Sequence, residues 1–132
     1  FGLVDIIKAS IPAPARRTGG NPAKRTIQAL RIETNDELGL IKRAIPMAQA
    51  LIRVGARVVV MSFQSLEDRI VKELFAEAST SKSPAKLPVE IPELAAKFVL
   101  VTKGAESASP QEQEANSRSQ SVRLRAIERV VA

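Results

Sequence analysis

The chain has 132 residues, of which 45% are hydrophobic and 26% charged, and this composition is typical of a soluble globular domain with a modest core. It contains no cysteine and no histidine, which excludes disulfides, Cys/His zinc sites, a thiol nucleophile and a histidine base. The net charge of +6 favours a polyanionic partner such as nucleic acid. Because only 3% of residues are aromatic, recognition of single strands by base stacking is disfavoured.

The longest apolar run, Val58 to Met61, is too short to span a bilayer, and the first ten residues carry no basic leader. We therefore expect a cytoplasmic protein with no membrane partner and no metal. The chain starts with Phe1 instead of methionine, so we also expect a processed or truncated piece of a longer protein.

Two helices are expected near the start of the chain. Residues 2–12 have the pattern of an apolar helix that two prolines end. The basic loop "ARRTGG" then leads to a helix capped by Asn21, with Pro22 in its first turn. Its spacing predicts an apolar face and an opposite polar stripe. The apolar face would comprise Ala23, Ile27, Leu30 and Thr34, and the stripe Lys24, Gln28 and Arg31.

A further helix is predicted from Asn35, with acidic residues in its first turn, and Pro46 should kink or divide it. Its expected core face is Leu38, Ile41, Ile45, Ala48 and Ile52. After a turn at Gly55, residues Arg57–Phe63 read as a strand buried on both faces.

A helix with a capping box formed by Ser65 and Asp68 should follow directly. Its expected core face is Leu66, Ile70, Leu74 and Ala78. Helix, buried strand, short loop and capped helix in this order are typical of a doubly wound α/β fold.

The remainder predicts two late strands. Residues 79–96 read as a surface loop, Lys97–Gly104 as a strand, and the polar stretch 104–120 as mobile. Residues 121–131 alternate with period two, which predicts a strand with one apolar face that contains Leu124 and Ala126. An antiparallel hairpin at the sheet edge accommodates both strands. Phe63, Phe75 and Phe98 are assigned to the core.

This set of strands is too small for a two-sided sheet, because the strand at Arg57–Phe63 needs neighbours on both edges. Either preceding strands are missing from the chain, or it pairs with another chain, for example in a homodimer.

Segments in register along the chain resemble a known family. They are "RTGGNPAKRTIQALRIETNDEL" (17–38), "MSFQSLEDRIVK" (61–72), "TKGAESAS" (102–109) and "NSRSQSVRLRAIER" (116–129). Together they are similar to the carboxy-terminal part of the bacterial 16S ribosomal RNA cytosine-N4 methyltransferases.

The resemblance implies a class I S-adenosylmethionine-dependent methyltransferase sheet of Rossmann-like type, present as its second half only and closed by the antiparallel strand pair. Residues 1–15 would be the exit from an inserted helical substrate-recognition domain, and 16–132 the carboxy-terminal half of the methyltransferase domain. The implied substrate is a cytosine in the decoding centre of 16S rRNA, within the small ribosomal subunit.

The chain departs from the family pattern at Asn21 and Gln64, where histidine is usual, and at Ile27, where an aromatic residue is usual. Asn and Gln hydrogen-bond but take up no proton near neutral pH, so a basic role for either position is in question. None of the glycines forms a GxGxG pattern after a strand, so no cofactor-binding residue is assigned, and the isolated chain is expected to be inactive.

No catalytic residue is assigned. Candidate pocket-lining residues lie at loop-to-helix boundaries, where a doubly wound fold places ligand groups: Asn21, Ser62, Gln64 and Ser65. For Ser65 a simple capping role is an equal alternative.

RNA-contact candidates are Arg16, Arg17, Lys24, Arg25, Gln28 and Arg31, against the alternative of a solvated helix face. Four further arginines, 118, 123, 125 and 129, either form a second basic patch or protect an edge strand, and the second interpretation is preferred.

Two other functions stay open. One is a donor-free module that binds RNA or protein through its basic face, and the other is a structural subunit that completes the sheet of another chain.

Overall fold

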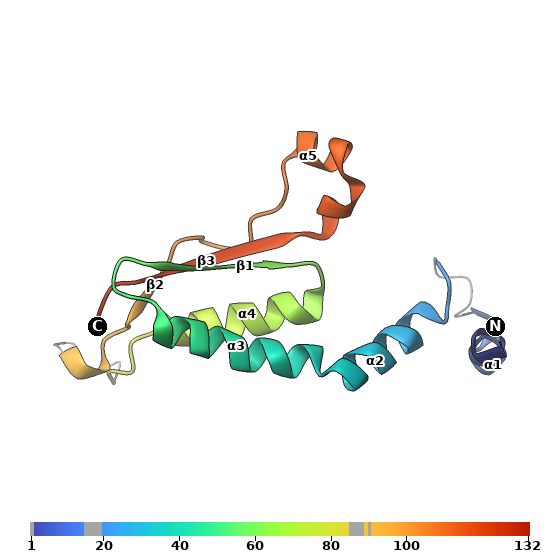
Figure 1. The fold of residues 1–132 in the computed structure, drawn as a ribbon, viewed down its shortest axis with the longest axis horizontal. Coiled ribbons are helices and arrows are strands. Elements are labelled where there is room, and N and C mark those ends of the chain that lie inside the picture. The colour runs from blue at the N-terminus through green and yellow to red at the C-terminus, as the bar shows by residue number, and fades with distance from the viewer. Residues whose placement is uncertain (1, 15–19, 85–88, 90) are drawn as a thin grey trace. The chain divides into compact units, whose positions relative to one another are not determined.

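The computed structural model describes residues 2–14, 20–84, 89 and 91–132, which form two compact units, Phe1–Glu37 and Leu38–Ala132 (Figure 1). The candidates Arg16 and Arg17 lie outside the described residues.

The first unit contains helices α1 (Gly2–Ser10) and α2 (Lys24–Asn35). Asn21 acts in the turn before α2, where its side-chain Oδ1 accepts a hydrogen bond from the Ala23 amide at 3.0 Å and its carbonyl accepts one from the Lys24 amide at 3.0 Å. The N-cap residue of α2 is Ala23, which has no side-chain capping hydrogen bond, so the prediction that Asn21 caps the helix is wrong; Asn21 stabilises the turn that precedes it. The expected apolar face is wrong in part, because Ile27 and Leu30 are 46% and 53% exposed, whereas Ala23 is buried.

Helix α2 ends at Asn35, and Asp36 adopts a left-handed conformation with φ 49°. The Asp36 amide donates back to the Ile32 carbonyl, which satisfies one of the free carbonyl groups at the helix end. The prediction that the next helix begins at Asn35 is therefore wrong by two residues, and α3 spans Glu37–Leu51. Pro46 lies inside α3, which is not divided in two.

The second unit is a three-stranded antiparallel sheet with helices on one side (Figure 1). The strands are β1 (Arg57–Ser62), β2 (Phe98–Leu100) and β3 (Arg123–Arg129), in the order β1-β3-β2. Helices α3 and α4 (Ser65–Ala78) lie side by side below the sheet in Figure 1. The short segments η2 (Pro92–Leu94), α5 (Pro110–Ala115) and η3 (Ser117–Ser121) complete the unit.

The core lies between the sheet and these two helices. Ile45, Val71 and Phe75 from the helices meet Val58, Phe98 and Ile127 from the strands. Ile41, Ala48, Ile52, Leu74 and Ala78 pack against this cluster, which confirms most of the predicted helix faces. The turn into β1 requires Gly55, whose φ of +83° is costly for a residue with a Cβ.

Strand β1 is buried on one face only, so the expectation of burial on both faces is wrong. Val58 and Ser62 are buried, whereas Val59 and Met61 are each 56% exposed. Phe63, expected in the core, is 52% exposed, while the assignments of Phe75 and Phe98 to the core are confirmed. The side of the sheet away from α3 and α4 therefore presents apolar side chains to solvent within the unit.

The side of β3 that carries Arg125, Ile127 and Arg129 faces the helices. The side that carries Leu124 and Ala126, which was predicted to be the apolar face, is the opposite one. Arg125 and Ile127 lie opposite Val60 and Val58, which face the core. Arg129 donates to the Ile52 carbonyl at 2.8 Å, and its guanidinium lies 6.0 Å from the centre of the Phe98 ring. Because β3 is also the central strand, the idea that its arginines protect an edge is wrong.

The expected antiparallel pairing of the two late strands is confirmed for β2 and β3. The expected place of the pair at the sheet edge is wrong for β3, which lies between β1 and β2 in the described sheet, and α5 and η3 separate the two strands along the chain. The stretch 104–120, predicted to be mobile, instead contains α5 and η3. Ser109 and Asn116 cap them, accepting hydrogen bonds from the amides of Glu112 at 3.2 Å and Arg118 at 3.1 Å. Such capping residues stabilise short helices in sequences that otherwise read as polar loops.

Candidate functional site

The first part of the candidate site is the turn from β1 into α4, which contains Ser62, Gln64 and Ser65. Ser62 ends β1 with 3% exposure, and its alternation with Val58 and Val60 directs it toward the helix side of the sheet. Ser65 is exposed in the first turn of α4. Chain connectivity thus brings these three candidates together, with one side chain buried.

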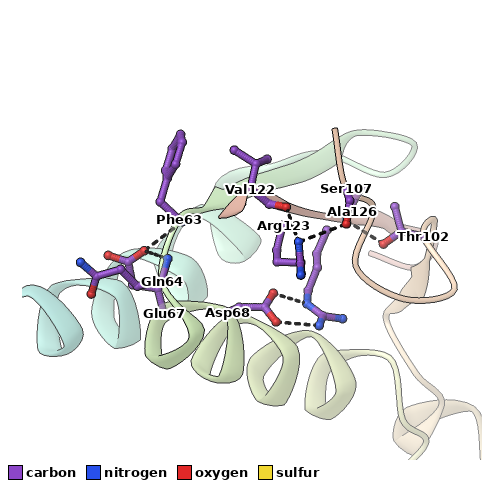
Figure 2. Close-up of polar contacts among 10 residues, drawn as sticks. Phe63, Gln64, Glu67, Asp68, Thr102, Ser107, Val122, Arg123 and Ala126 are labelled. Atoms are coloured by element: carbon purple, nitrogen blue, oxygen red, sulfur yellow. Dashed lines mark hydrogen bonds and ion pairs between the residues drawn. The ribbon is translucent and has the colours of Figure 1, made fainter. Parts of the chain in front are cut away.

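The capping box of α4 lies one residue earlier than predicted. Gln64, not Ser65, is the N-cap residue, and Glu67 is its partner. The Glu67 carboxylate accepts hydrogen bonds from the Phe63 and Gln64 amides, each at 3.2 Å (Figure 2). The side chains of Gln64 and Glu67 therefore satisfy amide groups at the helix start, and Phe63 points away from them in Figure 2.

Contrary to the prediction, Asp68 does not take part in the capping box and forms an ion pair with Arg125 instead. The guanidinium donates from Nε to Oδ1 at 2.7 Å and from a terminal nitrogen to Oδ2 at 2.9 Å. The side chains of Arg125 and Asp68 are only 15% and 19% exposed. The hydrogen bonds from Arg125 lower the pKa of Asp68, and this effect outweighs the raising effect of burial.

Sequence reasoning missed this pair because 57 residues separate its members. The signal in the sequence that could have indicated the pair is the spacing of Arg125 and Ile127. Two residues apart on a strand, they lie on the same side of the sheet, and Ile127 is buried. A guanidinium on the helix-facing side of a sheet needs an anionic partner, and Asp68 on α4 supplies it.

Hydrogen bonds hold the chain beyond β2 against β3 near this pair. Thr102, with 7% exposure, accepts a hydrogen bond from the Ala126 amide at 3.2 Å through its hydroxyl (Figure 2). Arg123 donates to the Ser107 hydroxyl at 3.1 Å and to the Val122 carbonyl at 2.9 Å. The arginines of β3 are thus engaged in structural contacts, which argues against their forming a second basic patch.

The second part of the candidate site is the basic side of α2. Lys24 and Arg25 are exposed, and Gln28 is partly buried on the same helix. Arg31 is exposed but forms a two-point ion pair with Glu37, with Nε at 3.0 Å from Oε1 and a second nitrogen at 3.2 Å from Oε2. An RNA phosphate would therefore compete with Glu37 for Arg31, whereas Lys24 and Arg25 are exposed and form no ion pair within the described part of the chain.

Among the described residues there is no group of acidic side chains arranged to hold a metal ion. No helix in this part of the chain has the length and apolar character needed to cross a membrane.

The described residues do not form a glycine-rich methyl-donor cradle. Such a cradle needs glycines where a strand passes into a helix, so that the backbone can approach the ligand closely. The turn after β1 is Ser62-Phe63-Gln64-Ser65, without glycine, and the two described glycines with positive φ, Gly20 and Gly55, do not follow a strand.

The sequence of nearly the whole chain matches a defined protein family. Residues 2–130 fit the MraW methylase family. The chain belongs to this family. Three relatives show the extent of the similarity, and each is called Ribosomal RNA small subunit methyltransferase H. They come from Mycobacterium sp. (strain KMS) and Mycolicibacterium smegmatis, each 57% identical over 97% of the chain, and from Nocardia farcinica, 53% identical over 98%.

The chain spans about a third of the length of the curated relatives it matches: 35%, 34% and 40% of these three proteins. This member of the MraW methylase family is 53–57% identical, along nearly its whole length, to these three proteins named as ribosomal RNA small subunit methyltransferases. The resemblance stated from the sequence is therefore confirmed at the level of the family.

Proposed function

We propose that this MraW methylase family chain is part of an S-adenosylmethionine-dependent enzyme that methylates N4 of a cytosine in 16S rRNA. The observation that carries the proposal is the family match over residues 2–130, together with relatives named as small-subunit rRNA methyltransferases. The substrate would be the small ribosomal subunit, and the reaction would take place in the cytoplasm.

In this proposal the chain supplies the carboxy-terminal half of a methyltransferase domain, and residues 1–15 lead out of an inserted helical domain. The coverage of about a third of the relatives supports it. So does the apolar side of the sheet away from α3 and α4, because large exposed apolar surfaces mark places where protein packs. In the described residues β1 pairs with β3 alone, which leaves its outer edge able to accept another strand.

The basic side of α2 would hold the RNA backbone. Lys24 and Arg25 would contact phosphates directly, while Arg31 would exchange Glu37 for a phosphate. Arg16 and Arg17 join this group by sequence alone. Gln28 would contribute hydrogen bonds to sugar or phosphate oxygens.

The turn Ser62–Ser65 would lie beside the extruded cytosine. The exocyclic amine is a weak nucleophile because its lone pair is delocalised into the ring, and the reaction needs it aligned with the methyl carbon. Exposed hydroxyl and amide oxygens, of which Ser65 is the accessible one in this turn, would accept hydrogen bonds from the amine and orient it. Asn21 belongs to the other compact unit and stays a candidate by sequence alone.

The decisive experiment uses a chimera in which the part of the Mycolicibacterium smegmatis relative that this chain does not match precedes the 132 residues. We expect methyl transfer from S-adenosylmethionine to isolated small ribosomal subunits, with N4-methylcytidine in the digested rRNA. A chimera that is folded and yields no methylated cytidine would count against the proposal.

The same chimera tests the RNA role of α2. Lys24→Ala with Arg25→Ala should weaken RNA binding and reduce the slope of log K against log[salt] by roughly 0.7–0.9 per lost phosphate contact. Lys42→Ala with Arg118→Ala removes the same charge elsewhere and should leave more of the binding. Equal losses from both pairs would contradict a specific role for α2.

A second candidate is a donor-free RNA-binding module, which the lack of a glycine-rich cradle in the described residues favours. Salt-dependent RNA binding by the 132 residues, combined with an inactive chimera, would support this alternative.

A further inference from the structure

A pocket of about 350 Å³ lies at the end of the sheet opposite to the Ser62–Ser65 turn. Its walls come from the last turns of α4, where Leu74 and Ala78 lie, and from Leu94 in η2 and Phe98 at the start of β2. Since α4 begins directly after the turn and runs away from it, thirteen residues separate Ser65 from Ala78 along the helix. The pocket is thus separate from the candidate site, and its volume is in the range of small-molecule sites.

Hydrogen bonds hold the outer wall of this pocket in place. The Leu94 carbonyl accepts hydrogen bonds from the Lys82 amide at 2.8 Å and from the Ser81 hydroxyl at 3.2 Å. Ser83 in turn accepts one from the Ile91 amide at 3.2 Å. These bonds connect η2 to the chain that leaves α4, so the pocket has formed walls on both sides.

One polar atom in the wall has no partner. Gln49 on α3 lines the pocket, and its side-chain Nε2 is buried without a hydrogen-bond acceptor among the described residues. A buried amide donor that makes no hydrogen bond is costly, and such groups are rare in folded proteins. A turn of the Gln49 side chain toward the pocket would let a ligand oxygen satisfy it.

The charges around the pocket are balanced. Glu77, Lys82, Glu93 and Lys97 contribute two negative and two positive groups, and none of these forms an ion pair within the described part of the chain. A balanced rim gives no preference for an anion or a cation, while Leu74, Ala78, Leu94 and Phe98 favour an apolar body. The combination selects an uncharged molecule that has an apolar part and a carbonyl oxygen.

We propose that this pocket binds a small uncharged ligand whose apolar body packs on Leu74 and Phe98 and whose carbonyl oxygen accepts a hydrogen bond from Gln49. The proposal does not depend on the proposed methyltransferase function, because none of the residues involved belongs to the candidate site. Binding of this kind would give the protein a second ligand site at the far end of the sheet.

The test uses N-acetyl-leucine amide as the probe and N-acetyl-glycine amide as its counterpart without the apolar side chain. Each is titrated into the isotopically labelled 132-residue protein and followed by NMR. For the leucine probe we expect shifts of the Gln49 side-chain amide and magnetisation transfer between the isobutyl group and Leu74 and Phe98. The glycine probe should bind at least about fivefold more weakly, since it buries less apolar surface.

Three variants locate the binding. Gln49→Leu removes the donor and should weaken the leucine probe roughly tenfold. Ala78→Leu fills the pocket and should abolish binding, whereas Ala44→Leu makes the same change at an exposed position of α3 and should not alter it. Unchanged affinity in Gln49→Leu, or no magnetisation transfer to Leu74 and Phe98 in the unaltered protein, would overturn the proposal even if Ala78→Leu failed to fold.

Discussion

The ion pair between Asp68 and Arg125 offers a sharp test of the fold, because the chain contains a matched pair at its surface. Both pairs join an arginine to a carboxylate with a closest distance of 2.7 Å. The side chains of Arg125 and Asp68 are 15% and 19% exposed, whereas those of Arg57 and Glu128 are 59% and 28% exposed. We therefore compare Asp68→Asn with Glu128→Gln, two nearly isosteric changes that each remove one negative charge.

The expected costs differ because of burial. Asp68→Asn leaves a largely buried guanidinium without its anion, and losing one partner of a fully buried pair costs about 3–5 kcal/mol. Since some exposure remains, we expect a loss of about 2–3 kcal/mol in the free energy of unfolding. Glu128→Gln should cost about 1 kcal/mol or less, as is usual for exposed pairs.

The measurement is urea unfolding followed by far-ultraviolet circular dichroism, because the chain has no tryptophan or tyrosine to report by fluorescence. The double variant Asp68→Leu with Arg125→Met should recover most of the loss, since it removes both charges and leaves apolar groups of similar size. Equal costs for Asp68→Asn and Glu128→Gln would refute the reasoning that burial of the pair decides its energy.

Two further predictions concern the same end of α4. The pKa of Asp68 in the folded protein lies below its ordinary value, so its stabilising contribution is complete above about pH 4 and is lost as the pH falls through the lowered folded value. The difference in stability between the unaltered protein and Asp68→Asn should therefore shrink in acid, and a difference that is constant down to pH 2 would contradict this. Glu67→Ala should cost about 1 kcal/mol because the Phe63 and Gln64 amides lose their acceptor, while Glu67→Gln keeps an acceptor and should cost less in the same urea assay.

Much of the second unit could be predicted from local sequence. Helix α4 starts one residue earlier than a cap at Ser65 implies and ends at Ala78, the last predicted core residue. The core positions Ile45 and Ile70 follow from spacing of three and four residues. The antiparallel pairing of the late strands was predicted correctly, although the prediction assumed no helix between them and the structure has α5 there. These features depend on neighbours along the chain, which the sequence displays directly.

Prediction from the sequence failed in two situations. In one, the partner of a residue is distant along the chain, as Arg125 is from Asp68. In the other, the helix cap is a neighbour of the predicted residue. The capping box was predicted at Ser65 and Asp68, but the adjacent Gln64 is the N-cap residue, so Glu67 serves the helix start. Local pattern also misassigned the two sides of β3, because it treated arginine as a solvent-facing residue. The functional roles of the candidate residues in the Ser62–Ser65 turn and in α2 stay predictions. The structure gives only the positions and contacts of their side chains.

The sequence by itself determined the order and type of most elements, the basic helix at 24–35 and the membership of the family, because periodicity and residue identity are local properties. Only the tertiary structure decided the strand order β1-β3-β2, the partner of Asp68 and the unsatisfied amide of Gln49. Each of these depends on which distant segments share one layer, and burial there sets whether a charge or an amide must find a partner.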